Sequence, residues 1–299
     1  MEIENDIRER LRTGVVLLDG GLATSLQARG LPVGAPPESW NLERPEQVQA
    51  VHEAFLGAGA AVIQTNSFGG NAAALERHAL KRRGLEVNRA AARLALAARD
   101  ALGGGLVAGS VGPTGHFFDA HCGEVDPGVG QQFRRQIEVL AGEGVDYLSL
   151  ETFTDPDEAL VVVEVVRELT DLPFTLCFTF DQVDGEPRTP SGETLGYCLI
   201  TAAEAGACGV GLNCSIGSQA MLEVAPPLLD DLEVPLIVKP NAGLPELAAG
   251  RPVYPEEPEE FADRLVRLAE LGARGVGGCC GCDADFIAAL RRALAAASG

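Results

Sequence analysis

The sequence is poor in aromatic and in basic residues. It has a single Trp and 5% aromatic residues in all, which disfavours an aromatic cage for a quaternary ammonium ligand. It has 23 Lys and Arg against 43 Asp and Glu, a formal net charge of −20. Such a chain repels a phosphate backbone, so we exclude nucleic acid as a partner.

Long apolar runs are absent as well. No stretch reaches the roughly 18 apolar residues of a membrane-spanning helix, so we expect no membrane partner. The first segment, MEIENDIRERLRTG, is charged and unlike a secretory signal peptide, so we expect a cytoplasmic location. Eight cysteines in such a chain indicate thiols or metal ligands rather than a disulfide framework.

The chain repeats one pattern, a β-rich apolar run followed by a turn and an amphipathic helical stretch. Helix starts are marked by Pro45 and by the pair Asp155-Pro156. Eight such units predict a single (β/α)8 TIM barrel over residues 1–299, in the α/β class, with a doubly wound open sheet as the alternative. The predicted strands are 15–21, 61–68, 105–113, 145–153, 173–180, 207–215, 234–243 and 274–281.

Most of these apolar runs have polar or thiol side chains at their carboxyl ends. Because a barrel enzyme takes its catalytic groups from the carboxyl ends of its strands, these residues predict an active site. The candidates are Asp19, Thr65, Asn66, Ser110, Glu151, Asn213, Cys214, Asn241, Cys279 and Cys280.

The motif GGCCG at 277–281 is the sharpest of these features. Flanking glycines allow the backbone to bend so that Cys279 and Cys280 reach one metal ion, and Cys214 in GLNCS offers a third thiolate. Three thiolates leave one position open on tetrahedral zinc, which is typical of a catalytic site. Cys282 could close it as a fourth ligand, and small buried side chains are the alternative interpretation for all eight cysteines.

The segment DGG at 19–21 suggests recognition of an α-amino acid. The backbone of Gly20 and Gly21 could hold a carboxylate, while Asp19 and Glu151 could accept hydrogen bonds from an ammonium group. Asp19 could equally be a turn residue, and Thr65, Asn66 and Asn213 could satisfy loop backbone. A loop at 114–128 carries His116 and His121, which could be metal ligands or part of a lid.

Taken together and in order, the motifs resemble the homocysteine S-methyltransferase family. The matching segments are LLDGGLATSLQARG, ESWNL, VHEAFLGAGAAVIQTNSF, GSVGPTG, DYLSLETFTD, GLNCS and GGCCG. The resemblance implies a zinc-dependent enzyme that moves a methyl group onto the thiolate of zinc-bound homocysteine and forms methionine. It assigns Zn²⁺ to Cys214, Cys279 and Cys280, and the amino-acid end to Asp19, Gly20, Gly21 and Glu151. From their places at the strand ends, we also expect substrate contacts from Thr65, Asn66, Ser110, Asn213 and Asn241.

The methyl donor is the open part of this prediction. TPSGETL, GLNCSIG and KPNAGLP look most like the homocysteine domain of cobalamin-dependent methionine synthase, where the matching Asn241 can occupy the open zinc position. We therefore expect a methyl-corrinoid (cobalamin) carried by a separate protein. The alternatives are a small donor, namely S-methylmethionine, S-adenosylmethionine or betaine, or a non-catalytic zinc or amino-acid sensor. Trp40 could stack on a small donor or simply pack its loop onto the barrel.

Overall fold

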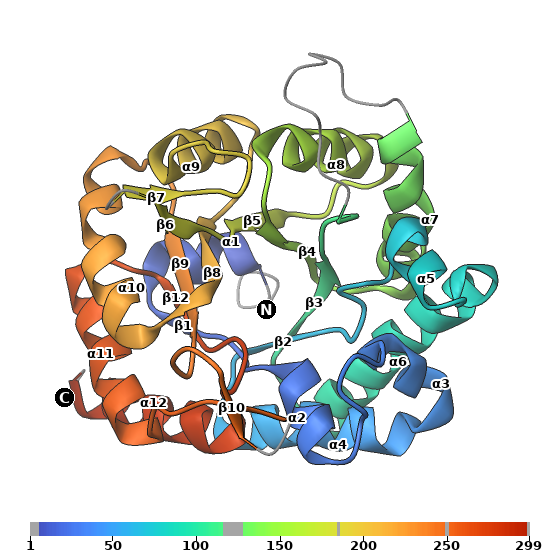
Figure 1. The fold of residues 1–299 in the computed structure, drawn as a ribbon, viewed down its shortest axis with the longest axis horizontal. Coiled ribbons are helices and arrows are strands. Elements are labelled where there is room, and N and C mark those ends of the chain that lie inside the picture. Colours follow the sequence, from blue (N-terminus) through green and yellow to red (C-terminus); the bar gives the residue numbers. More distant parts are fainter. Residues whose placement is uncertain (1–5, 116–127, 184–185, 249–250, 298–299) are drawn as a thin grey trace.

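Eight parallel strands form one nearly closed barrel in the computed structural model, which describes residues 6–115, 128–183, 186–248 and 251–297 (Figure 1). The barrel predicted from the sequence is confirmed, and the doubly wound alternative is wrong. Across the remaining seam, the Ala61 amide donates to the Leu17 carbonyl over 2.7 Å. In sheet order the strands are β1 Val16–Leu17, β12 Gly275–Val276, β9 Leu236–Asn241, β8 Val210–Gly217, β5 Phe174–Phe178, β4 Tyr147–Phe153, β3 Leu106–Val111 and β2 Val62–Gln64.

Helices surround the strands (Figure 1). The predicted helix starts are confirmed: one helix begins at Pro45, and the Asp155 side chain caps another by accepting from the Asp157 amide over 2.8 Å. The α-helices are α1 Ile7–Thr13, α2 Leu22–Ala28, α3 Trp40–Glu43, α4 Pro45–Ala58, α5 Ala72–Arg77, α6 Gly84–Leu102, α7 Gly128–Glu143, α8 Pro156–Leu169, α9 Leu195–Glu204, α10 Ser218–Val224, α11 Pro258–Leu271 and α12 Ala284–Ala297. Among the described residues, 3-10 helices cover Pro37–Ser39, Lys81–Arg83 and Pro226–Asp231.

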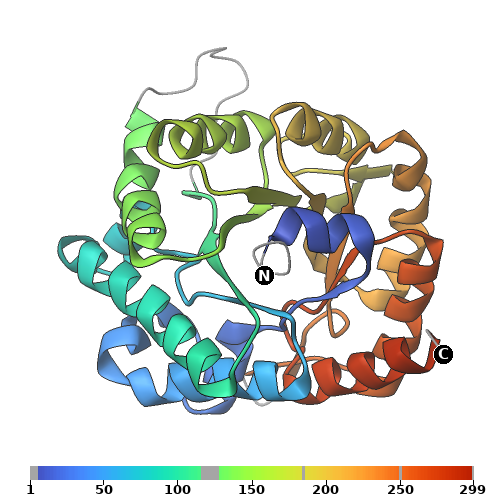
Figure 2. The ribbon, with the colours of Figure 1, turned by 180° about the vertical axis from the view of Figure 1, so that it is seen from behind.

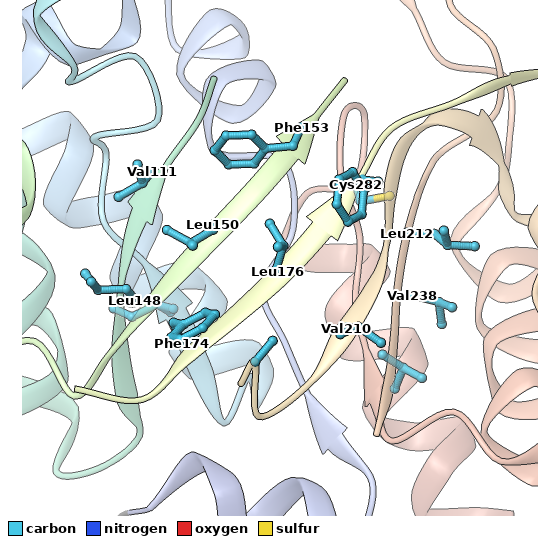
Figure 3. Close-up of a cluster of buried hydrophobic side chains, with 14 of the residues drawn as sticks. Val111, Leu148, Leu150, Phe153, Phe174, Leu176, Val210, Leu212, Val238 and Cys282 are labelled. Atoms are coloured by element: carbon cyan, nitrogen blue, oxygen red, sulfur yellow. The ribbon is translucent and has the colours of Figure 1, made fainter. Parts of the chain in front are cut away.

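The core has two layers because each strand is buried on both faces. Outward-facing side chains such as Leu148, Leu176 and Val238 pack under the helices (Figure 3). Inward-facing side chains such as Ile237 form a second cluster with Ile7 of α1, and that helix lies across the amino-terminal opening of the barrel (Figure 2). This double burial explains why the strands read as continuous apolar runs.

The alternation of side chains places polar groups inside the upper barrel. Val62 and Ile237 face the interior, so Gln64 and Lys239, two residues further along β2 and β9, face it too. Glu151 lies on the inward face of β4 by the same period. The polar groups at the ends of separate strands therefore converge at the mouth of the barrel.

Two short hairpins complete the described chain, β6 Asp181–Val183 with β7 Glu186–Arg188, and β10 Glu246–Ala248 with β11 Arg251–Val253. The candidate loop residues His116 and His121 lie outside the described residues. Within the described part of the chain, every helix is too short or too polar to span a bilayer.

Candidate active site

The three predicted thiols lie together at the mouth of the barrel. The sulfur atoms of Cys214, Cys279 and Cys280 are all within 4.8 Å of one another. Cys214 sits at an irregularity of β8, where it adopts φ +65° and turns its side chain out of the regular ladder. Cys279 and Cys280 follow β12 in a turn, held there because the Cys279 amide donates to the Pro240 carbonyl over 2.8 Å.

The donor set suits a soft metal ion such as zinc. At a Zn–S distance of ~2.3 Å, tetrahedral geometry places sulfurs about 3.8 Å apart, and three thiols within 4.8 Å need little movement to reach it. Hydrogen bonds from the other two thiols lower the pKa of Cys214. The hydrogen bond with Cys214 raises the pKa of Cys280 to about 12.

Cys282 is not part of this cluster in the structure. Its thiol is fully buried, lies 3.7 Å from the Pro240 carbonyl, and belongs to the apolar core (Figure 3). Asn241 does lie beside the cluster, where its Oδ1 accepts from the Cys280 amide over 3.1 Å. Of the two residues considered for the open metal position, only Asn241 is therefore next to the three thiols.

Gly20 and Gly21 hold the turn after β1 against the cysteine loop. A Cβ at Gly21 would lie 2.4 Å from the Cys279 carbonyl oxygen, and one at Gly20 would lie 2.2 Å from the Cys282 carbonyl oxygen. The Gly21 amide already donates to that Cys282 oxygen over 2.8 Å. These glycines therefore allow two backbone segments to touch, a role that the sequence analysis did not foresee.

A cavity of about 300 Å³ opens beside the thiols. That volume lies at the lower end of the range for small-molecule sites. The cavity is lined by the three thiols, the segment from Gly20 to Thr24, the aromatic Phe68, the carboxylates of Asp19, Glu38 and Glu151, and one cation, Lys239.

Glu151 is anchored through one carboxylate oxygen. Its Oε1 accepts from the side-chain amide of Gln64 over 2.8 Å and also from the Ser110 hydroxyl. Burial raises the pKa of Glu151, whereas Lys239 and these two hydrogen bonds oppose the rise. No described residue donates to Oε2, so that oxygen is available to a ligand in the cavity.

Both oxygens of Asp19 are already bonded within the protein. Oδ2 accepts from the backbone amide of Gln64 over 2.7 Å, and this hydrogen bond crosses the seam between β1 and β2. Oδ1 accepts from Lys239 Nζ over 3.1 Å in a buried ion pair. The side chain of Asp19 therefore joins β1 to β2 and β9.

Lys239 and Gln64 are the functional candidates that the sequence analysis missed. Each is a polar residue near the end of an otherwise apolar strand, the same signal that singled out Glu151. Glu38 was missed as well. It is 4% exposed in a 3-10 turn, accepts from the Gly69 amide over 2.6 Å, and has a pKa raised by burial.

The remaining candidates bond mainly to neighbouring loops. Thr65 accepts from the Ser110 amide over 3.0 Å, and Asn66 donates to the Pro37 carbonyl over 2.8 Å. Asn213 does not line the 300 Å³ cavity but clamps Thr152, accepting from its amide over 2.8 Å and donating to its hydroxyl over 2.7 Å. Trp40 is buried in the core, away from the cavity lining.

Comparison with known proteins shows the family of this chain. A family model described as Homocysteine S-methyltransferase matches residues 16–294. The chain belongs to this family. The family predicted from the ordered motifs is thereby confirmed.

Within the homocysteine S-methyltransferase family, the relatives have small methyl donors in their names. Betaine–homocysteine S-methyltransferase 1 of Xenopus tropicalis is 36% identical over 214 residues, which cover 69% of this chain and 50% of that protein. S-methylmethionine–homocysteine S-methyltransferase BHMT2 of Pongo abelii is 34% identical over 223 residues, covering 73% of this chain and 56% of that protein. The chain thus spans about half the length of these relatives.

A solved structure matches nearly the whole chain. The metallated form of the homocysteine methyltransferase MmuM from Escherichia coli superimposes with a TM-score of 0.77 at 26% identity, covering 94% of this chain and 96% of MmuM. The agreement in fold extends over the described barrel.

Proposed function

We propose that this protein is a zinc-dependent homocysteine S-methyltransferase that uses a small, positively charged methyl donor and produces methionine. The observation that carries the proposal is the cluster of Cys214, Cys279 and Cys280 at the edge of a cavity rich in carboxylates. Cys214, Cys279 and Cys280 would hold the ion, with Asn241 beside the open position. Zinc bound there would lower the pKa of the substrate thiol and so supply a nucleophile at neutral pH.

The amino-acid end of homocysteine would lie against Glu151. The free Oε2 of Glu151 can accept from the α-ammonium group, and the ion pair of Asp19 with Lys239 lines the same cavity. The segment beginning at Gly20 and Gly21 lines the adjacent wall and would face the carboxylate. Hydrogen bonds at the strand ends would hold Glu151 and the glycine segment in place. They are made by Thr65, Asn66, Ser110 and Asn213. Such positioning brings the thiol and the methyl group into line.

The donor proposal departs from the methyl-corrinoid protein favoured by the sequence motifs. The relatives are named for betaine and for S-methylmethionine, both of which carry the methyl group on a positively charged atom. Glu38 and Glu151 give the cavity an excess of negative charge, and Phe68 adds an aromatic face. These features support a small ammonium or sulfonium donor.

The test combines metal analysis with a methyl-transfer assay. Purified protein is expected to contain about one zinc per chain and to form methionine from homocysteine with S-methylmethionine or betaine. Cys214→Ala should lose both the zinc and the activity. Cys208→Ala is the matched control, since Cys208 precedes the same strand at the opposite end of the barrel and is outside the cluster.

Each contrary result points to a different error. Zinc retained in Cys214→Ala would contradict the ligand assignment. Activity with methylcobalamin, but with neither S-methylmethionine nor betaine, would show that the methyl donor is a corrinoid. Stoichiometric zinc with binding of homocysteine and no transfer from any of these donors or S-adenosylmethionine would favour a sensor.

A further inference from the structure

Lys239 is one of only two lysines in the chain, and it is buried in the substrate cavity. The residue is 5% exposed, and the other lysine, Lys81, lies on the surface in an ion pair with Glu76. Burying an ammonium group is costly unless it is paired and hydrogen-bonded. Burial alone would lower the pKa of Lys239, but Asp19 and Glu151 raise it above its ordinary value, so the group stays charged.

The partners of Lys239 connect it to Glu151. Its Nζ donates to Asp19 Oδ1 over 3.1 Å and to the Gln64 side-chain oxygen. Because lysine has only donors, Gln64 must turn its oxygen toward Lys239 and its NH₂ group away. That NH₂ group then donates to Ser149 Oγ over 2.9 Å and to Glu151 Oε1 over 2.8 Å.

This orientation leaves one carboxylate oxygen of the pair Asp19 and Glu151 for a ligand. Both oxygens of Asp19 already accept hydrogen bonds, one from Lys239 and one from the backbone amide of Gln64. Glu151 has Oε1 occupied, and Oε2 receives no donor from the described residues. Asp19, Lys239 and Glu151 set two carboxyl groups against one ammonium group in the cavity lining, which leaves a place for one further ammonium group.

We propose that Lys239 is a specificity-determining positioning residue that withdraws Asp19 from the substrate and fixes Gln64 so that Glu151 alone binds the α-ammonium group. The inference rests on the proposed function for the identity of the amino acid. Lys239 and the α-ammonium group that it helps to select are both positively charged. The selection is for an amino-acid thiol over a thiol that lacks the amino group.

The experiment compares two thiols that differ only in that group, homocysteine and 4-mercaptobutanoate. Dissociation constants are measured by calorimetry on zinc-loaded protein for wild type, Lys239→Met, the double variant Asp19→Asn/Lys239→Met, and Lys81→Met. Lys81→Met is the matched control because it makes the same change at the exposed lysine. Thermal unfolding of each variant monitors the fold.

Wild type is expected to prefer homocysteine, and Lys239→Met to reduce that preference about tenfold, because Gln64 is released and two uncompensated carboxylates face each other. The double variant should recover part of the preference by removing the second negative charge. In the transfer assay, the loss should fall on KM for homocysteine rather than on kcat.

Other results would overturn the proposal. Equal weakening of both thiols in Lys239→Met would mean a purely structural role. An unchanged or increased preference would exclude selection through Glu151, and an equal loss in the single and double variants would exclude charge compensation. Failure of wild type to bind either thiol would instead contradict the proposed function, and the role of Lys239 with it.

Discussion

At the scale of single residues, the amino-acid pocket depends on one carboxylate oxygen. Glu151 is nine-tenths buried and is anchored by Gln64 and Ser110 through its other oxygen. Replacement by Gln keeps the size and the anchored acceptor oxygen, but it puts an NH₂ donor in place of the oxygen that faces the ligand. The geometry separates these two contributions because the anchored and the free oxygen have different partners.

Glu151→Gln is expected to raise KM for homocysteine by about tenfold to a hundredfold, since the charge-assisted hydrogen bond to the α-ammonium group is lost and an NH₂ donor takes its place. Steady-state kinetics with varied homocysteine measure the effect, and zinc content should stay at the wild-type value. A variant with unchanged KM would show that the ammonium group binds elsewhere.

Gly21 makes a different prediction because it touches the cysteine loop. Gly21→Ala forces a Cβ to 2.4 Å from the Cys279 carbonyl oxygen, so the loop must shift. We expect zinc affinity to fall about tenfold or more, as for other residues that orient metal ligands. Competition with a chromogenic chelator measures this affinity. Gly57→Ala in α4 is the control, because a Cβ there meets no atom within 4 Å; a similar loss in both variants would contradict the argument.

The candidate residues were predictable from sequence to different degrees. The thiols could be predicted because paired cysteines between glycines have few other uses. Lys239 and Gln64 could not be assigned, because their function lies in hydrogen bonds between strands that are far apart in sequence. Asp19 illustrates the same limit: its type suggested a ligand contact, whereas its two oxygens are bonded to residues of β2 and β9.

At the scale of elements, the strands were predictable because apolar runs and turns report burial directly. Each of the eight predicted runs overlaps a strand of the barrel, and all but one contain it; β8 extends two residues beyond its run, to Gly217. The short hairpins at 181–188 and 246–253 were not anticipated, since their strands have only three residues each and carry no long apolar run. The closure of the barrel across the β1–β2 seam was also beyond the sequence, because it depends on the Ala61 amide and the Asp19 side chain.

Helix α4 contains an acid-sensitive residue, His52. Its imidazole is fully buried, neither nitrogen has a hydrogen-bond partner in the described structure, and burial lowers its pKa from 6.5 to about 4. The unfolded chain therefore binds a proton in the window between these values that the folded chain does not. Stability contributed by the neutral side chain is complete above about pH 6.5 and is lost as the pH falls toward 4.

The expected loss is about 2 kcal/mol in the free energy of unfolding between about pH 7 and pH 5. Urea unfolding at several pH values measures it, with His52→Leu as the variant that cannot titrate. The wild-type slope should exceed that of the variant in this window. Parallel pH profiles would show that His52 is not protonated on unfolding.

At the scale of the whole molecule, the net charge of −20 opposes compactness and attracts cations. Raising KCl from about 20 mM to about 500 mM shortens the Debye length and should raise the Tm by a few degrees, as differential scanning fluorimetry can record. The same change should increase KM for a cationic methyl donor. A donor KM that is independent of salt would contradict long-range attraction by the acidic surface.

The contact between Gly21 and the cysteine loop has a consequence for how the protein is made. The segment that carries Cys279 and Cys280 must dock on the turn after β1, so the metal site joins a region synthesised early to one synthesised more than 250 residues later. A nascent or broken chain that stops before residue 279 has one thiol of the three. Zinc binding would therefore distinguish chains with a complete barrel from chains that stop before residue 279.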